Sequence, residues 1–301
     1  MHWQIPAPLE TARVRTTGGS QVILRRHGNP AGPRILLTHG NGLAADLCYP
    51  YWSLLADRYD LVLYDLRSHG WNPVGDLLAQ NFPTLVGDNG YVARAVGRHF
   101  GEKAMVGIYH SVSALVALCD ALREKAEFSA LVLFDLPICP PGGAPEDLEE
   151  SLGRVAARTR KRQGWFESRA HFVEQIRRAR TFERLRPGVA ELFAETTLRP
   201  AANGGYELRC PIEHEAVIYE YGFGWAMQTQ LALEQVALRC PVKAIGSDPT
   251  VPYSFLPGMD LHLLTKLNYD FLPDTTHFLL LENPEECAAL TMEFLDRSGI
   301  A

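Results

Sequence analysis

The stretch that decides the fold reads Met105-Val106-Gly107-Ile108-Tyr109-His110-Ser111-Val112-Ser113-Ala114-Leu115. Its apolar run predicts a buried strand, and the small and apolar residues 112–122 recur at helical spacing. A strand, a sharp turn carrying a serine and then a helix are the context of a nucleophile elbow, in which the turn holds the hydroxyl of Ser111 clear of the sheet. The helix N-terminus below it would stabilise negative charge.

The match to the usual elbow pattern, G-x-S-x-G, is incomplete. The outer positions are normally small because the turn brings two backbones close together. Ser113 is small enough, but Tyr109 fits only if its ring points away from the crossing. A buried structural serine at a strand end would give the same local sequence, so the rest of the chain has to decide between the two interpretations.

Composition limits the classes of protein to consider. The chain has 301 residues, 47% hydrophobic and 21% charged, which suits one large domain or a domain with an insertion. A net charge of −6 gives no reason to expect nucleic acid as the main partner. No apolar run is long enough for a membrane span, and residues 1–6 lack a signal-peptide pattern, so we expect a cytoplasmic protein. The six cysteines have no metal-ligand spacing, which indicates reduced thiols and no metal site.

Short apolar runs and helical patterns alternate along most of the chain, which predicts an α/β fold with a parallel sheet. A Gly-Gly turn at residues 17–20 predicts a hairpin before this alternation begins. The expected strands are at 34–38, 61–64, 105–110, 130–135, 242–246 and 267–272, and the expected helices are at 44–56, 85–100, 112–122, 256–264 and 284–295.

The alternation breaks at the Pro-Pro-Gly-Gly segment, residues 140–143. We therefore expect a core formed by residues 1–139 and 237–301, with a mainly helical cap inserted at 140–236 and a hairpin in that cap at residues 203–205. Residues 154–186 hold eleven Lys or Arg and three Glu, a local charge of +8. This segment is either a set of solvated helix faces or a region that attracts an anionic substrate.

A serine nucleophile needs a neighbouring base, and the base needs an orienting acid. In a parallel sheet such groups gather at the carboxyl ends of the strands. His277 lies in the loop after the last expected strand, and Asp248 follows the strand before it. The sequence therefore predicts Ser111, Asp248 and His277 as catalytic residues, with Asp135, which also ends a strand, as an alternative acid.

The polar motifs at these strand ends together resemble those of the α/β-hydrolase superfamily, in its form with a helical cap. The resemblance covers about residues 20–137 and 238–298. It is carried by His39-Gly40-Asn41-Gly42, similar to an HG-x oxyanion loop, by Asp65-Leu66-Arg67-Ser68-His69-Gly70, similar to a D-x-R-G-H-G turn, by Asp248, and by Thr276-His277-Phe278-Leu279, similar to a G-H-F segment. Ser68 replaces the first glycine of the family's turn.

The resemblance implies a mostly parallel, doubly wound sheet of eight strands and the triad order Ser, Asp, His. It also implies an oxyanion hole formed by the backbone N–H groups of Val112 and Asn41, with Gly42 as a close rival to Asn41. We expect Gly42 to contact substrate as well. His110 is a further candidate for substrate contact, although a packing role fits its place beside a tight turn. His39 and His69 are expected to hold their loops by hydrogen bonds.

Aromatic residues of the cap could line an apolar pocket that faces Ser111, or they could be the core of the cap. Those considered are Trp165, Phe166, Tyr219, Tyr221, Phe223 and Trp225, and we expect Trp165, Tyr219 and Trp225 to bind substrate.

These features together predict a serine hydrolase that needs no cofactor and cleaves a small carboxylic ester, lactone or thioester. Carbon–carbon bond hydrolysis and acyl transfer remain open, because the fold does not fix the bond that is cleaved. The family's aspartate-nucleophile chemistry is disfavoured because Ser111 holds that place. A non-catalytic ligand receptor is the alternative from another class, supported by Tyr109 and Ser68 at glycine positions. The sequence gives no indication of oligomeric state.

Overall fold

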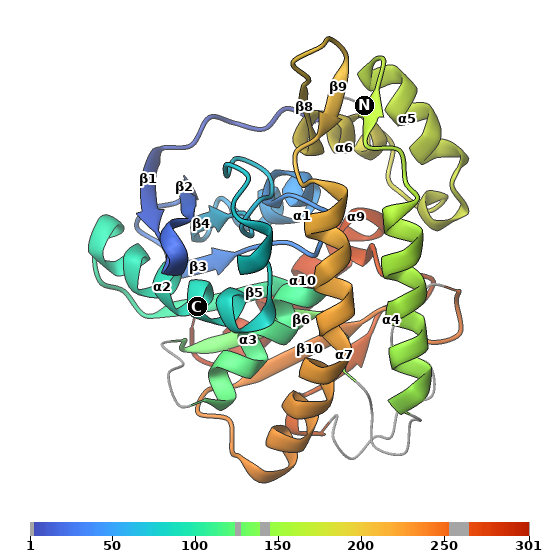
Figure 1. The fold of residues 1–301 in the computed structure, drawn as a ribbon. Coiled ribbons are helices and arrows are strands. Elements are labelled where there is room, and N and C mark those ends of the chain that lie inside the picture. Colours follow the sequence, from blue (N-terminus) through green and yellow to red (C-terminus); the bar gives the residue numbers. More distant parts are fainter. Residues whose placement is uncertain (1–2, 124–127, 139–144, 253–264, 301) are drawn as a thin grey trace.

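The computed structural model describes residues 3–123, 128–138, 145–252 and 265–300, and its centre is an eight-stranded sheet (Figure 1). In spatial order the strands are β1 (Glu10–Arg15), β2 (Gln21–Gly28), β4 (Asp60–Tyr64), β3 (Arg34–Leu37), β5 (Met105–His110), β6 (Ala130–Phe134), β10 (Val242–Gly246) and β11 (Asp270–Phe271). β2 pairs antiparallel with β1 and with β4, whereas the other neighbouring strands are parallel. The predicted α/β class, the mostly parallel sheet and the hairpin at 17–20 are confirmed.

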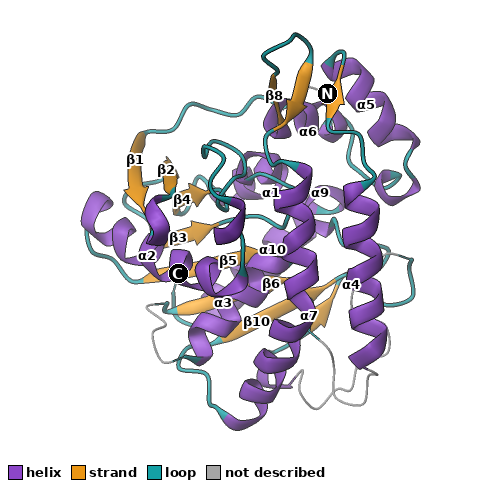
Figure 2. Cartoon of the chain, viewed as in Figure 1, coloured by secondary structure: helices purple, strands orange, loops and turns teal. Residues whose placement is uncertain are grey.

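Helices cover both faces of the sheet (Figure 2). One face packs against α2 (Phe82–Phe100), α3 (Val112–Leu122) and the C-terminal half of α7 (Ile212–Gln235). The other face packs against α1 (Tyr49–Trp52), α9 (Leu279–Glu282) and α10 (Pro284–Arg297). Consecutive residues of one strand enter opposite cores, because side chains alternate along a strand: Leu36 faces α2 and α3, and Ile35 faces α1.

Two elements are shorter than the sequence predicts, and one lies outside the described residues. The expected helix at 44–56 consists of α1 flanked by two 3-10 turns, Ala45–Cys48 and Ser53–Leu55. The expected strand at 267–272 is extended only in β11, because Asn268 adopts a positive φ of 43° that interrupts extended backbone. The helix expected at 256–264 lies outside the described residues.

The segment between β6 and β10 forms a layer over the carboxyl ends of the strands (Figure 1). It contains α4 (Pro145–Arg160), α5 (Arg169–Arg178), α6 (Val189–Thr197), α7 and a small antiparallel sheet in the order β7 (Trp165–Phe166), β9 (Tyr206–Leu208) and β8 (Leu198–Pro200). The hairpin predicted at 203–205 joins β8 to β9. We refer to this segment below as the cap.

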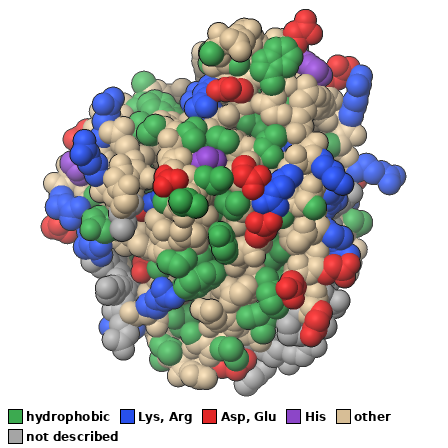
Figure 3. Space-filling model, in the orientation of Figure 1, with side chains coloured by type: hydrophobic (Ala, Val, Ile, Leu, Met, Phe, Trp, Pro, Cys, Tyr) green, Lys and Arg blue, Asp and Glu red, His purple; other side chains and the backbone are tan. Residues whose placement is uncertain are grey.

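Glutamates neutralise much of the basic charge at residues 154–186. On the face in Figure 3, Lys and Arg side chains lie beside Asp and Glu side chains. The ion pairs are Arg154–Glu150, Arg160 with Glu213 and Glu220, Arg162 with the buried Glu215, Arg177–Glu191, Arg178–Glu174 and Arg186–Glu285. These groups are largely exposed, so the segment matches the solvated helix faces considered above more closely than a focused anion site.

Two expectations from composition can be compared with the described residues. No helix within them is both long and apolar enough to cross a membrane. The five cysteines among them, Cys48, Cys119, Cys210, Cys240 and Cys287, are free thiols.

Candidate active site

Ser111 sits on a strained turn between β5 and α3. Its backbone has φ 58° and ψ −127°, a conformation that residues other than glycine rarely adopt, and it is the N-cap residue of α3. Its N–H donates to the carbonyl oxygen of Phe134 at 2.8 Å, which ties the turn to the end of β6. This is the strand–turn–helix geometry that the sequence predicts for residues 105–115.

Tyr109 is accommodated because its ring points into the core and away from the elbow. Its hydroxyl donates to Oδ1 of Asn89 at 2.8 Å, and its ring meets Phe128 edge-on, with the centroids 5.9 Å apart. A Cβ atom at Gly107 would lie 2.5 Å from Cε2 of Tyr109. The glycine two residues upstream therefore leaves room for the ring on the same side of the strand.

Ser111, His277 and Asp135 form a chain of hydrogen bonds at the carboxyl edge of the sheet. Nε2 of His277 lies 2.9 Å from Oγ of Ser111, and Nδ1 of the same ring lies 2.5 Å from Oδ2 of Asp135. Oδ1 of Asp135 accepts two further bonds, each 2.8 Å long, from the N–H and the hydroxyl of Ser247. Complete burial alone would raise the pKa of Asp135, but the hydrogen bond and charge of His277, with the Ser247 donors, hold it below its usual value.

Asp248, the predicted acid, does not reach His277. Its Oδ1 accepts from the N–H and the hydroxyl of Thr250 at 2.8 and 2.6 Å, and its Oδ2 accepts from the N–H of Asp274 at 2.9 Å. These bonds cap the loop that carries Asp248. They also lower the pKa of Asp248, and the hydrogen bond from the Thr250 hydroxyl makes the largest contribution. The structure thus corrects the assignment: the carboxylate on the imidazole is the alternative one, Asp135. It follows β6, the immediate neighbour of the strand that carries Ser111.

Two backbone N–H groups near Ser111 are candidate donors for an oxyanion hole. Val112 is the first residue of α3, so its N–H has no acceptor within the helix. The N–H of Asn41 has no acceptor among the described residues, and its neighbour Gly40 lies so close to the elbow that a Cβ there would be 3.0 Å from Cβ of Ser111. The rival donor, the N–H of Gly42, is already bound to Nε2 of His69 at 3.0 Å.

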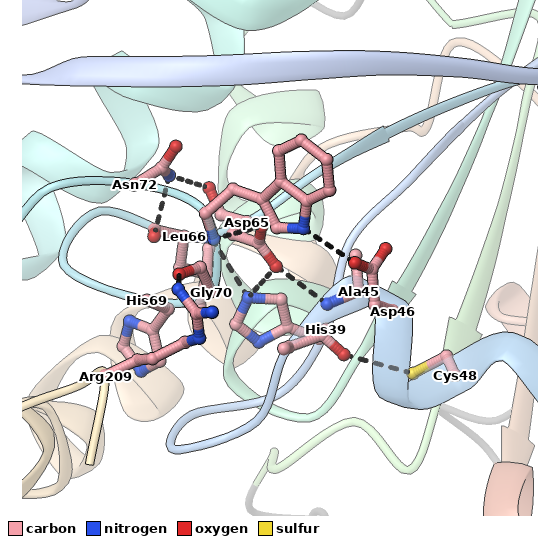
Figure 4. Close-up of polar contacts among 12 residues, drawn as sticks. His39, Ala45, Asp46, Cys48, Asp65, Leu66, His69, Gly70, Asn72 and Arg209 are labelled. Atoms are coloured by element: carbon pink, nitrogen blue, oxygen red, sulfur yellow. Dashed lines mark hydrogen bonds and ion pairs between the residues drawn. The ribbon is translucent and has the colours of Figure 1, made fainter. Parts of the chain in front are cut away.

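Buried neutral histidines hold the oxyanion loop in place (Figure 4). Nδ1 of His39 lies 2.7 Å from the Gly40 carbonyl, which can only accept, and Nε2 accepts from the N–H of Leu66 at 3.1 Å. His69 bonds the Arg67 carbonyl through Nδ1 at 2.8 Å, which leaves Nε2 to accept from Gly42. Burial lowers the pKa of both rings, that of His69 to about 4, so neither carries charge near neutral pH.

Asp65, directly after β4, anchors the same region (Figure 4). Its carboxylate accepts from the N–H of Ala45 at 2.8 Å, as Figure 4 shows. It also accepts from the N–H of Trp71 at 3.0 Å and from Nη1 of the fully buried Arg25 at 2.6 Å. Burial would raise the pKa of Asp65, but the charge of Arg25, with hydrogen bonds from its guanidinium and from the N–H of Trp71, holds it well below its usual range. The turn that resembles D-x-R-G-H-G therefore has a structural role here.

His110 lies beneath His277 and does not contact the cavity described below. Its Nε2 donates to the carbonyl oxygen of His277 at 2.8 Å, and the two ring centroids are 4.7 Å apart. Burial, and then the neighbouring His277, lower the pKa of His110 to about 3. The predicted substrate contact is therefore corrected to a packing role. The carboxylate of Glu282 supports the same loop by accepting from the N–H and the hydroxyl of Thr276 at 2.6 and 2.5 Å.

A cavity of about 260 Å³ lies between the cap and the strand ends and reaches His277. Its lining includes Gly40, Asn41 and Gly42 and the polar side chains of Arg162, Glu215, Tyr219, Gln163 and Gln175. Its apolar lining consists of five phenylalanines, Phe166, Phe172, Phe182, Phe193 and Phe278, together with Leu43, Ile176, Ala179 and Leu208. Two wider surface hollows, of about 610 and 400 Å³, have none of Ser111, His277 and Asp135 in their walls.

The structure brings only some of the predicted substrate contacts to this cavity. Gly42 and Tyr219 line it. Trp165 does not: its side chain lies on the outer side of the small sheet, is 48% exposed and donates to the Gly204 carbonyl. Trp225 does not line it either: it is partly buried against the core, and its ring stacks on Phe82 with the centroids 5.7 Å apart. The sequence does not predict most of the phenylalanines that line the cavity, because their spacing is also the spacing expected for residues in the hydrophobic core of the cap.

The buried histidines predict a loss of stability in mild acid. The pKa values of His27, His69 and His110 are lowered from 6.5 to about 4, 4 and 3, chiefly by burial, so the unfolded chain binds protons that the folded chain does not. Stability must then fall as pH drops below the unfolded value. Between pH 7.5 and 5.5 we expect a loss of roughly 4 kcal/mol from the three together, measured by urea unfolding at each pH.

One variant pair isolates this effect. His27→Phe keeps an aromatic ring packed against Trp52, at a position remote from Ser111. It should remove about a third of the pH dependence of the free energy of unfolding. His99→Gln, at an exposed position, should leave the slope unchanged. An unchanged slope in His27→Phe would contradict the assignment of a neutral buried imidazole.

The comparisons with known proteins concern the family and the fold. The family model described as "Alpha/beta hydrolase family" matches residues 35–290. Among solved structures, E-2-(acetamidomethylene)succinate hydrolase is similar at 19% identity, over 95% of this chain and 99% of that one, with a TM-score of 0.75. A thioesterase domain from the curacin biosynthetic pathway follows at 18% identity, 94% and 99% coverage and a TM-score of 0.72. A thermophilic esterase from Thermogutta terrifontis has 21% identity, 96% and 99% coverage and a TM-score of 0.69. No curated protein sequence matches significantly.

Proposed function

Because this chain belongs to the alpha/beta hydrolase family, we propose that it is a serine hydrolase that cleaves a carboxylic ester through an acyl-enzyme on Ser111. The observation that supports this proposal is the unbroken hydrogen-bonded chain from Oγ of Ser111 through the imidazole of His277 to Asp135. A hydroxyl is a weak nucleophile at neutral pH, and an imidazole with an orienting carboxylate is the arrangement that activates it.

The chemistry requires two displacements at one carbonyl carbon. Oγ of Ser111 bonds to the carbon while its proton passes to Nε2 of His277, and the N–H groups of Asn41 and Val112 stabilise the oxyanion. The bond to the leaving alcohol then breaks, and His277 returns the proton to that alcohol. Water repeats the attack with His277 as base and releases the acid and Ser111. One ester and one water give one acid and one alcohol.

The same steps suit a lactone or a thioester, since both present an acyl carbon with a leaving heteroatom. Carbon–carbon hydrolysis and acyl transfer to another acceptor use the same nucleophile and remain alternatives within the enzymes.

Tyr109 and Ser68, at positions where the family has glycine, are the sequence features that favour a non-catalytic receptor, and the fold accommodates both side chains. Tyr109 has room at the elbow because of Gly107. Ser68 adopts the positive φ of the glycine it replaces, 63°, and its hydroxyl accepts from the N–H of Gly75 at 3.1 Å. Neither departure from the family pattern disturbs the hydrogen-bonded chain.

Labelling with a fluorophosphonate tests the proposal directly. The wild-type protein should become labelled, with the adduct on the peptide that contains Ser111 by mass spectrometry, and should hydrolyse short p-nitrophenyl esters. A protein that is neither labelled nor active on these esters and the matching thioesters would be the receptor instead.

A further inference from the structure

The cavity beside His277 has one wall formed by a continuous series of aromatic rings. From the cap inward, the rings of Phe166, Phe172, Phe193, Phe182 and Phe278 have successive centroid separations of 4.9, 5.8, 5.6 and 4.9 Å. The last ring lies 5.6 Å from the imidazole of His277. All five line the cavity, although they come from β7, α5, α6, the turn after α5 and the His277 loop.

The ring geometry suits an aromatic guest. The interplanar angles along the series are 86°, 52°, 67° and 54°, so the rings meet edge-on or tilted and no pair is stacked flat. Aromatic pairs in such orientations gain favourable free energy beyond the burial of their area. A phenyl ring in the cavity could continue the same packing, whereas a saturated group of equal size would gain only the burial term.

The size of the cavity limits the guest. A cavity of about 150 Å³ lined by Leu, Ile and Phe accommodates benzene. The 260 Å³ available here therefore fits one ring with a short linker to the reacting carbonyl.

The polar side chains that line the cavity disfavour an anionic guest. Arg162 is the only Lys or Arg among the described residues that line the cavity. Its guanidinium is ion-paired with the carboxylate of Glu215, which is only 3% exposed. The Glu215 carboxylate also lies against Gly42, where a Cβ would be 2.6 Å from its Cδ. A substrate carboxylate would therefore meet a pair with no net charge, and the adjacent Glu215 oxygens would repel it.

We propose that this cavity selects substrates that carry a single-ring aromatic group, so that the protein is an aryl or arylalkyl ester hydrolase. The inference rests on the proposed function, since it specifies the substrate of the same site.

The substrate test uses esters whose other half is not aromatic, with acid release followed by a pH indicator. Methyl phenylacetate and benzyl acetate place the ring on either side of the scissile bond, and their cyclohexyl analogues match them in size. At least one aryl ester should exceed its cyclohexyl analogue about fivefold in kcat/KM, and should exceed methyl decanoate and monomethyl succinate at least tenfold. Equal or better hydrolysis of the decanoate or the succinate would overturn the proposal.

Binding without chemistry provides a second measurement. Ser111→Ala protein should bind 2-phenylacetamide more tightly than hexanamide by calorimetry. Adding Ala179→Phe, which places a ring into the cavity wall, should abolish that binding, whereas Ala170→Phe, exposed on α5 and outside the cavity, should not. Phenylacetamide binding that survives Ala179→Phe in a folded protein would overturn the proposal. If the wild type is labelled by fluorophosphonate but shows no aryl preference, the substrate class is wrong and the serine hydrolase assignment stands.

Discussion

Replacing Ser111 by alanine should lower kcat/KM for the best ester by about 10⁶-fold, to a level set by substrate binding and the oxyanion donors alone. The hydroxyl is the atom that forms the acyl-enzyme. The nearby hydroxyl of Ser113 cannot take its place, because it is bonded to both the N–H and the carbonyl of His110, at 3.0 and 2.9 Å. Initial rates and fluorophosphonate labelling of the purified variant check this expectation.

Ser113→Ala is the matched control, since it removes a hydroxyl from the same turn without touching the reacting atoms. Its loss costs two hydrogen bonds at the start of α3, so we expect about 1–2 kcal/mol of lost stability and activity within about tenfold of wild type. If Ser113→Ala abolished labelling and Ser111→Ala did not, the nucleophile would be misassigned.

The elbow could be predicted because its signal is local. An apolar run, a serine and a small-residue helix specify a strand, a turn and a helix without reference to the rest of the chain. Whether Tyr109 fits the turn could not be decided in the same way. The answer depends on Asn89 and Phe128, which are remote in sequence, and on the absence of a side chain at Gly107.

The acid was harder to predict because two aspartates satisfy the same sequence rule. Asp135 and Asp248 each follow a strand of the parallel sheet, at neighbouring positions along its edge. What separates them is where their carboxylates find donors. Asp248 is satisfied within its own loop, whereas Asp135, with a φ of 42°, turns its carboxylate toward Ser247 and His277. That choice depends on backbone dihedrals, which the sequence pattern does not report.

The lining of the cavity was beyond prediction for a related reason. Phe172 and Phe193 lie on helices at spacings that suit either a cap core or a pocket wall. In the structure they are both, since they pack on other cap residues and also border the cavity. Only the arrangement of the cap on the core distinguishes the two, and the sequence of each helix alone cannot specify it.

Asp135→Asn should lower kcat/KM by about 10⁴-fold while leaving fluorophosphonate labelling slow but detectable. The reason is the tautomer of His277. Ser247 presents two donors to Oδ1 of Asp135, so an amide at this position should keep its oxygen toward Ser247 and turn its NH₂ toward the imidazole. Nδ1 of His277 would then have to accept, and the ring proton would move to Nε2. A protonated Nε2 cannot take the proton of Ser111.

Asp248→Asn provides the contrast that separates the two candidate acids. Its Oδ1 can still accept from both Thr250 donors, and only the bond from the Asp274 N–H is lost. We expect about 1 kcal/mol of lost stability by urea unfolding and kcat/KM within about threefold of wild type. If the two variants lost activity equally, His277 would have to exchange Asp135 for Asp248 as its hydrogen-bond partner during the reaction. If Asp248→Asn alone were inactive, Asp248 would be the acid of the working enzyme. The comparison is informative because both carboxylates sit at one edge of one sheet, and only one of them contacts the imidazole.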